Sequence, residues 1–153
     1  MQKTVLTYGT FDLFHIGHLS LLQRLRALGD RLIVGVSTDE FNEIKGKKTV
    51  VPFSDRIEIV GALRCVDLAI PEENWEQKVG DIQRHNIAVF GMGSDWEGRF
   101  DELKLHCEVV YLPRTEGVSS THIRKTLKVL DRSHVRELKQ ALDLISSIVE
   151  RFD

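Results

Sequence analysis

The sequence has only two cysteines and three prolines, and it lacks any apolar run long enough to cross a membrane. Cys65 and Cys107 are far apart and form no C-x-x-C motif, so we expect two free thiols in a reducing compartment. A spanning helix needs about 20 consecutive apolar residues. The N-terminus carries one lysine before a short apolar run, too short for a signal peptide. These absences predict a cytoplasmic protein that does not enter membranes.

An excess of charge of either sign is also missing. The chain has 21 Lys and Arg against 23 Asp and Glu, a formal net charge of −2. A general nucleic-acid binder would carry a basic excess, and an acidic tail would favour a cationic partner. Neither class fits. With 153 residues, 42% of them hydrophobic, the chain is long enough to form one domain with a substantial core.

Short β-branched or apolar runs alternate with segments of helical periodicity. Ser54 is an expected N-cap, and Asn74 with Gln77 is an expected capping box. Residues 38–51 are expected to form a polar, lysine-rich loop. This alternation predicts a Rossmann-like, doubly wound α/β domain around a parallel sheet. The strands are expected at 3–8, 31–37, 67–70, 87–93 and 107–113, and the helices at 19–28, 54–64, 75–84 and 119–128.

The C-terminal segment has a different pattern, with apolar residues at intervals of three and four. Such spacing predicts a narrow apolar seam on one long helix. Its charges are mixed, whereas a helix lying on a membrane surface would be more basic. We expect the seam to pack on the body of the protein or on a partner subunit, and we divide the chain into a domain at 1–128 and a helical extension at 129–153. The seam consists of Val135, Leu138, Leu142, Ile145, Val149 and Phe152.

The segment "GTFDLFHIGH" follows the first predicted strand, where ligands of open parallel sheets bind. Gly9 is expected to allow a tight turn, and Gly17 to allow phosphates to approach the backbone. A helix beginning near His18 would direct free N–H groups at an anion. His15 and His18 would then donate to the same phosphates, although such a pair also serves as helix caps or core hydrogen bonds. No third ligand at a familiar spacing supports zinc, and neither phosphate-loop fingerprint is present.

The segment "PRTEGVSSTHIRK" follows the last predicted strand and offers a second anion site. Arg114 has a planar donor fork for a phosphate, and Gly117 permits a turn. Ser119, Ser120 and Thr121 bring hydroxyls and N–H groups to a helix start. A serine pair alone would more simply be a helix cap. Two candidate anion sites at the mouth of one sheet are more informative than either one.

These motifs also carry a resemblance to a known family. "GTFDLFHIGH" and "RTEGVSST", together with "STDEFN", "VDLAIPEENWEQK" and "MGSDWEGRFD", are similar to the cytidylyltransferase branch of the H-x-G-H nucleotidylyltransferases. The resemblance spans roughly residues 3–128. It implies transfer of a cytidylyl group from CTP to the phosphate of sn-glycerol 3-phosphate, giving CDP-glycerol and pyrophosphate by direct in-line attack. It also implies Mg²⁺ bound with CTP, a homodimer that pairs through the nucleotide-binding domain, and a product used in teichoic acid or capsule polymers. The C-terminal seam is a second possible dimer surface.

The resemblance assigns roles to individual residues. Lys45, Trp75 and Lys78 would bind the glycerol phosphate, and Asp95 would face the nucleotide or a metal. Without the family, Lys45 and Lys47 would be solvated loop lysines, Trp75 a core residue and Asp95 a turn cap. The implied catalytic residues are His15, His18, Lys47 and Arg114. The implied nucleotide-binding residues are Thr10, Phe11, His15, Ile16, Gly17, His18, Lys47, Arg64, Asp95, Arg114, Thr115, Glu116, Gly117, Val118, Ser119, Ser120 and Thr121.

Two other functions stay open on the sequence. The acceptor could be phosphocholine or phosphoethanolamine, but a choline site needs an aromatic cage or carboxylates, and the lysines near Trp75 favour an acceptor without a positive head. The second is a non-catalytic CTP-binding module. Such a module would be expected to lose His15, His18 or Arg114, and all three are present.

Overall fold

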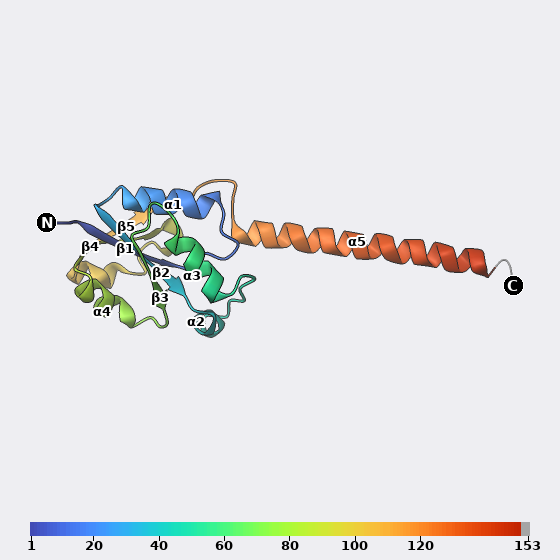
Figure 1. Cartoon of the computed structure of the whole chain (residues 1–153), viewed down its shortest axis with the longest axis horizontal. Helices are drawn as coiled ribbons and strands as arrows, with labels where there is room; N and C mark the ends of the chain where they lie inside the picture. Colours follow the sequence, from blue (N-terminus) through green and yellow to red (C-terminus); the bar gives the residue numbers. More distant parts are fainter. Residues whose placement is uncertain (151–153) are drawn as a thin grey trace. The chain divides into compact units, whose positions relative to one another are not determined.

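The body of the protein is a five-stranded parallel sheet (Figure 1). The computed structural model describes residues 1–150, and of residues 129–133 only the backbone. The strand order is β3-β2-β1-β4-β5. This arrangement confirms the predicted Rossmann-like, doubly wound architecture. The strands are β1 (Thr4–Gly9), β2 (Arg31–Ser37), β3 (Leu68–Glu72), β4 (Ile87–Gly93) and β5 (Glu108–Leu112).

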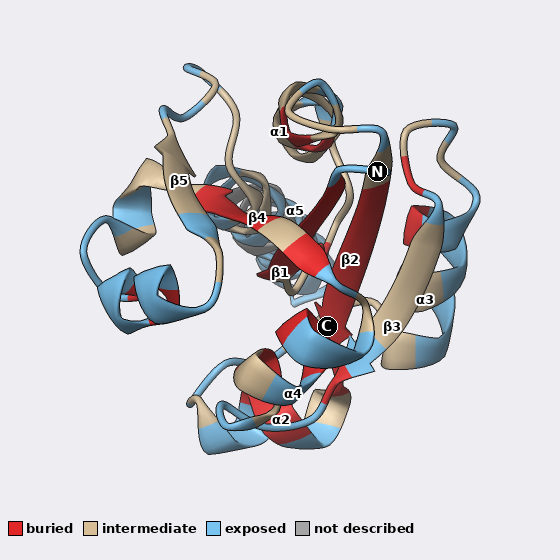
Figure 2. Ribbon diagram, turned by 90° about the vertical axis from the view of Figure 1, so that its left-hand side faces the viewer, coloured by how far each residue is buried: buried red, intermediate tan, exposed pale blue. Residues whose placement is uncertain are grey.

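Helices cover both faces of the sheet, and the central strands are the most buried (Figure 2). Successive side chains of a strand point to opposite faces. Val5 of β1 therefore packs with Leu22 of α1 and Val60 of α3, while Leu6 packs with Ile82 of α4 on the other face. The helices are α1 (Ile16–Arg26), α2 (Asp39–Ile44), α3 (Phe53–Gly61), α4 (Gln77–Arg84) and α5 (Ser120–Val149), with short 3-10 helices η1 (Ser94–Trp96) and η2 (Asp101–Leu105).

Two local predictions in the first half of the chain are wrong. Part of the expected loop at 38–51 is helix α2, which Thr38 caps by accepting a hydrogen bond from the N–H of Phe41 at 3.1 Å. Ser54 does not cap α3, which begins at Phe53 without any side-chain cap. The N–H of Phe53 instead donates to the carboxylate of Asp39 at 3.0 Å. A tertiary contact thus replaces the local one expected from the sequence.

The start of α4 is partly as predicted. Asn74 and Gln77 exchange the two hydrogen bonds of the expected capping box. The helix itself begins at Gln77, so Trp75 lies before it rather than within its first turn. This position leaves the indole 42% exposed. Trp75 is therefore not a core residue, which was its simplest alternative assignment.

The strand order reverses between β1 and β4, which fixes the place where a ligand is expected. In open parallel sheets the crevice lies beyond the carboxyl ends of the strands at this switch point. His15 follows β1, and Asp95 follows β4 after one intervening residue. The predicted site residues on these two segments therefore flank the switch point.

A buried arginine holds the carboxyl ends of two strands together. Arg56 of α3 is 1% exposed, and its Nη1 donates to the carbonyls of Thr10 and Ser37 at 2.7 and 2.8 Å. Its Nε donates to the carbonyl of Val51, and its Nη2 contacts the Asp39 carboxylate at 2.7 Å. One guanidinium thus joins the ends of β1 and β2, the start of α2 and the loop before α3. The sequence reading did not find this residue.

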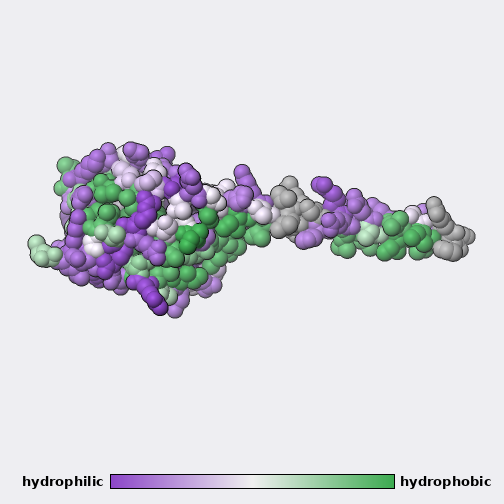
Figure 3. Space-filling model, turned by 90° about the horizontal axis from the view of Figure 1, so that it is seen from above, coloured by the Kyte–Doolittle hydropathy of each residue, from purple (hydrophilic) through white to green (hydrophobic). Residues whose placement is uncertain are grey.

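The chain divides into two compact units, Met1–Val118 and Ser119–Asp153. In the second unit the helices expected at 119–128 and in the tail are one continuous helix, α5. The predicted boundary at 128/129 falls inside this helix, and the domain division stays a prediction. Apolar residues gather along one side of α5 (Figure 3). Five of the six seam residues are more than half exposed, while Phe152 lies outside the described residues: Val135, Leu138, Leu142, Ile145 and Val149.

No helix within residues 1–150 is both long enough and apolar enough to span a bilayer. Cys65 and Cys107 are free thiols, as the sequence predicted.

Candidate active site

The two histidines cap helix α1 reciprocally. The N–H of Gly17 donates to Nδ1 of His15 at 3.1 Å, and the N–H of His15 donates to Nδ1 of His18 at 3.2 Å. The rings stack with centroids 3.9 Å apart. An Nδ1 that accepts a hydrogen bond has no proton, so each neutral ring carries its proton on Nε2. Both rings therefore keep an Nε2–H donor for a ligand.

Burial keeps this pair uncharged. It lowers the pKa of His18 to about 4, with a further lowering from His15 and an opposing effect of Asp12. Burial also lowers the pKa of His15. Nε2 of His15 is buried and has no hydrogen-bond partner within the described residues. A buried donor without a partner is costly, so this atom has the capacity to bind an acceptor.

The two glycines of this segment make room for rings, while the approach of phosphates to the backbone at Gly17 stays a prediction. A Cβ on Gly9 would lie 2.8 Å from the ring of Phe11, and one on Gly17 would lie 2.9 Å from Cε1 of His15. Phe11 is 6% exposed and meets the ring of His18 edge-on at 5.6 Å. It has a positive φ of 53°, which non-glycine residues adopt at a cost. The geometry places Phe11 as a support for His18.

The segment after β5 lies against the start of α1. A Cβ on Gly17 would be 3.7 Å from the carbonyl oxygen of Val118. Nε of Arg114 lies 3.5 Å from the carboxylate of Asp95, with both side chains more than half exposed. Gly117 has a φ of 82°, so it supplies the expected turn. The structure thus pairs Arg114 with Asp95 and places Val118 beside Gly17, next to the histidine pair, with Thr115 and Glu116 between Arg114 and Val118.

Ser119, Ser120 and Thr121 begin the second unit. Oγ of Ser119 accepts from the N–H of His122 at 3.0 Å, which makes it the N-cap of α5. This is the simpler role that the sequence had left open. Contact of these three residues with CTP stays a prediction.

The three residues predicted to bind the acceptor lie together around a buried carboxylate that the sequence reading missed. Glu72, at the end of β3, is 3% exposed. Its Oε2 lies 2.9 Å from Nζ of Lys78, and its Oε1 lies 3.6 Å from Nζ of Lys45. Oε1 also accepts from the hydroxyl of Ser37 at 2.6 Å. The ammonium of Lys78 lies 4.8 Å from the ring centroid of Trp75, and that of Lys45 lies 5.6 Å from it.

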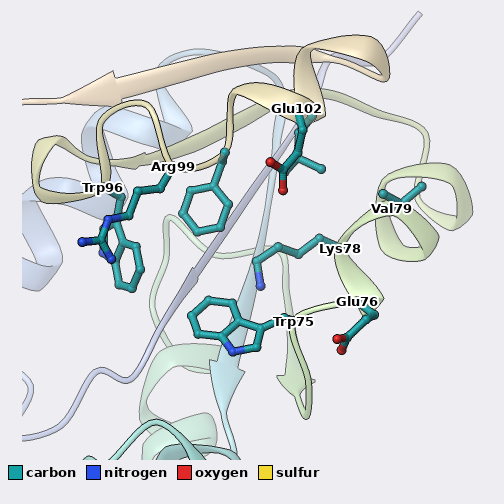
Figure 4. A pocket seen from close by; sticks show the side chains of 9 residues that line it. Trp75, Glu76, Lys78, Val79, Trp96, Arg99 and Glu102 are labelled. Carbon is teal, nitrogen blue, oxygen red and sulfur yellow. The ribbon is translucent and has the colours of Figure 1, made fainter.

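Aromatic rings form the walls of a cavity beside these lysines (Figure 4). The cavity has a volume of about 490 Å³. The rings of Trp75 and Trp96 lie 6.3 Å apart. Figure 4 shows Lys78 directed toward the space between the indoles, with Glu76 and Glu102 at other parts of the wall. The lining residues are Trp75, Glu76, Lys78, Val79, Trp96, Arg99, Phe100, Glu102 and Leu103.

Three more of the predicted nucleotide-binding residues are Thr10, Ile16 and Lys47. The hydroxyl of Thr10 donates to Asn42 at 3.2 Å, and Lys47 lies 5.7 Å from the ring of Trp96. Ile16, at the start of α1, is 61% exposed. These three belong to segments at the carboxyl edge of the sheet.

Arg64 is not brought together with the other predicted site residues. It is exposed and lies in the segment between α3 and β3. Asp67 in the same segment accepts from the N–H of Leu32 near the start of β2, at the amino edge of the sheet. The role assigned to Arg64 by the resemblance stays a prediction.

Comparison with known proteins identifies the family. The sequence model of the family described as "Cytidylyltransferase-like" matches residues 6–126. The chain belongs to the cytidylyltransferase-like family. The match runs from β1 to the first part of α5 and so includes every predicted site residue.

Curated relatives are similar over most of the chain. A glycerol-3-phosphate cytidylyltransferase of Bacillus spizizenii is 56% identical over 129 residues, which are 84% of this chain and 100% of that protein. One from Bacillus subtilis is 58% identical over 126 residues, which are 82% of this chain and 98% of that protein. The lipopolysaccharide core biosynthesis protein of Thermoplasma volcanium has a similar fold, with a TM-score of 0.65, 21% identity, and coverage of 76% of this chain and 100% of that one.

The sequence did not predict the burial of two charged side chains of this cytidylyltransferase-like chain, Glu72 and Arg56, although each has a weak signal in the sequence. Glu72 follows an apolar run in "DLAIPEE", so an acid at a strand end was visible. Its burial depends on Lys45, which comes from a distant element. Arg56 was visible as one charge in the helix "SDRIEIVGALR", where it would normally face solvent. Tertiary contacts decide both positions.

The protonation of the histidine pair can be measured directly. We expect ¹⁵N NMR at pH 7 to show both rings as neutral Nε2–H tautomers, because each Nδ1 accepts a backbone hydrogen bond. Lowering the pH should protonate His18 only near pH 4. Because its folded pKa is depressed, the unfolded state binds more protons below about pH 6.5, so stability should fall from that pH toward pH 4. Nδ1–H tautomers, or a His18 ring that titrates near 6.5, would contradict this assignment.

Proposed function

We propose that this chain transfers a cytidylyl group from CTP to sn-glycerol 3-phosphate, forming CDP-glycerol and pyrophosphate. The observation that carries this function is the 54–58% identity, over most of the chain, to three glycerol-3-phosphate cytidylyltransferases. The lysine pair at Lys45 and Lys78 is the structural feature that supports an anionic acceptor. A cytoplasmic location, in which Cys65 and Cys107 stay reduced, is part of this proposal.

The residues of the site suit a direct displacement. A phosphate monoester is largely ionised near pH 7, so the acceptor needs no strong general base. One of its oxygens forms a bond to the α-phosphorus of CTP, and the bond from that phosphorus to the oxygen shared with the β-phosphorus breaks. Pyrophosphate leaves with the electron pair. The protein has to align the reactants and stabilise charge, which Nε2–H groups of His15 and His18 and the cations of Arg114 and Lys47 can do.

Magnesium is proposed as a partner of CTP rather than as a metal held by a protein cage. Within the described residues no group of three or more His, Cys, Asp or Glu side chains could hold a metal ion. Mg²⁺ commonly binds through one or two carboxylates, phosphates and water. Asp95, next to Arg114 at the switch point, fits the part of a single carboxylate ligand. When bound, the ion would supply charge neutralisation at the phosphates.

The aromatic rings of the acceptor region disfavour choline or ethanolamine head groups. An aromatic cage binds a cation only if its ring faces are available. Here the protein's own cations occupy them: Lys78 lies 4.5 Å from the ring of Tyr8, Lys45 lies 4.4 Å from that of Phe41, and both lie over Trp75. Trp96 has Lys47 and Arg99 as neighbours. A second positive group would meet repulsion at each face.

The acceptor can be tested with three phosphorylated alcohols. With CTP and Mg²⁺ present, pyrophosphate release should be at least about a hundredfold faster with sn-glycerol 3-phosphate than with phosphocholine or phosphoethanolamine, since mispaired charge in a buried site costs about 2–3 kcal/mol or more. The control is CTP without acceptor. Equal rates with phosphocholine would reassign the acceptor, and no release with any of the three would favour the non-catalytic CTP-binding module.

The proposed assembly is a homodimer in which α5 pairs with a second copy. The seam residues repeat at intervals of 3, 4, 3 and 4 from Val135 to Val149, which is the a/d pattern of a two-stranded coiled coil. They are 56–64% exposed. The alignments with the two Bacillus relatives cover 126–129 residues, which is almost the whole length of each relative. They leave part of the 153-residue chain without a counterpart in either relative.

Light scattering can test the pairing. A full-length variant with Leu138, Leu142 and Ile145 replaced by Gln should be a monomer that still releases pyrophosphate, because only the seam is changed. Changing the polar residues Glu137, Gln140 and Asp143 of the same helix to Ala is the matched control and should leave a dimer. A dimer that survives the three Gln substitutions would show that α5 does not hold the copies together.

A further inference from the structure

A carboxylate at the centre of an anion site requires an explanation. Glu72 is buried between Lys45 and Lys78, the two cations that the proposed function assigns to the acceptor phosphate. A negative charge there weakens the attraction for a phosphate. A carboxylate with only a structural role could lie away from the lysines, where it would not weaken their attraction for a phosphate. Its place suggests that the lysines themselves depend on it.

The contacts show what Glu72 does to the two lysines. Lys45 is the C-cap residue of α2, and Lys78 lies in α4, so no local structure brings their side chains together. Each meets one oxygen of the Glu72 carboxylate. The hydroxyl of Ser37 links Lys45 and Glu72 a second time, accepting from Nζ of Lys45 at 2.9 Å and donating to Oε1 of Glu72 at 2.6 Å. The carboxylate thus determines where both ammonium groups lie above Trp75.

Without this carboxylate the lysines would repel each other in a poorly solvated place. Burial lowers the pKa of Lys45, and Glu72 gives the largest opposing effect. Lys47 and Lys78 lower this pKa further. Asp81 of α4 is a further charged group nearby, which accepts from the hydroxyl of Tyr8 at 2.7 Å, while the ring of Tyr8 lies against Lys78. Glu76, Arg99 and Glu102 line the cavity together with Lys78. Glu72 is therefore the group that offsets both burial and repulsion at Lys45.

We propose that Glu72 is the positioning residue of the acceptor site, holding Lys45 and Lys78 as a charged pair that binds a phosphate dianion. This inference rests on the proposed function, because that function makes the lysines acceptor ligands. The two ammonium groups attract a compact phosphate monoester, and the carboxylate between them repels any acceptor with additional negative charge near the lysines.

Glu72→Gln tests this role because it keeps the shape and an acceptor oxygen but removes the charge. Glu73→Gln is the matched control, since the neighbouring side chain is exposed. In Glu72→Gln we expect the KM for sn-glycerol 3-phosphate to rise at least about tenfold, the effect of losing one charged hydrogen bond, while the KM for CTP changes less than about threefold. Glu73→Gln should change neither. Equal rises in both KM values, or none, would overturn the proposal.

A pH profile separates positioning from a general loss of structure. In Glu72→Gln the pKa of Lys45 should fall further, because the largest opposing effect is removed, so Lys45 should lose its charge at a lower pH than in the wild type. The ratio of the acceptor KM at pH 9 to that at pH 7 should then exceed the wild-type ratio by about fivefold or more, because each unit of pKa is a tenfold change in equilibrium. An unchanged ratio would overturn the proposal. If Glu72→Gln does not fold, Glu72→Asp keeps the charge and should raise the acceptor KM with the wild-type pH ratio. An acceptor KM equal to wild type in Glu72→Asp would then overturn it.

Binding can be measured without turnover. The chain has two tryptophans, Trp75 and Trp96, and both line the cavity. Titration with sn-glycerol 3-phosphate in the absence of CTP should change their fluorescence, with a Kd at least about tenfold weaker in Glu72→Gln than in Glu73→Gln. If the wild-type protein binds this ligand but releases no pyrophosphate with CTP, the proposed function fails and Glu72 is still tested. Equal Kd values in the two variants would overturn the role of Glu72 alone.

Discussion

The carboxyl edge of this sheet depends on one buried guanidinium. The guanidinium of Arg56 donates hydrogen bonds to three carbonyls and contacts one carboxylate, and these four groups belong to four different segments. Taking a charge out of water costs several kcal/mol unless it is fully paired. These contacts pair the guanidinium and hold the ends of β1 and β2 next to the start of α2. Thr10 leads into the histidine segment, and Ser37 contacts Glu72, so the same residue connects both halves of the site.

The histidine pair shows how capping and ligand binding use different atoms of one ring. Nδ1 of each imidazole is occupied by a backbone N–H of the helix start, which leaves the opposite nitrogen as a donor. Serine or aspartate could cap the helix but would offer no donor on the far side. A side chain at position 17 would crowd the ring of His15, because a Cβ there would lie 2.9 Å from Cε1. The H-x-G-H spacing therefore follows from one local arrangement.

The sequence predicted what depends on neighbours along the chain and missed what depends on contacts between distant elements. The strands β2 and β4 were placed to the residue because their continuous apolar runs are bounded by polar, charged or glycine residues. Helix α2 was missed because six mostly polar residues give too short a periodic signal. Glu72 and Arg56 were missed because burial of a charged residue needs partners that sequence spacing does not reveal. Gly9 was assigned to a turn, whereas the reason for a glycine there is the ring of Phe11.

The central claim is that the site aligns two phosphate groups for one direct displacement and forms no bond to the protein. The stereochemical course at the α-phosphorus tests it most directly. One diastereomer of CTP carrying sulfur on the α-phosphorus is converted with sn-glycerol 3-phosphate, and the configuration of the thio-CDP-glycerol is read by ³¹P NMR. Direct in-line attack gives inversion at phosphorus. Retention would mean two successive displacements through a covalent intermediate on the protein, and it would contradict the account.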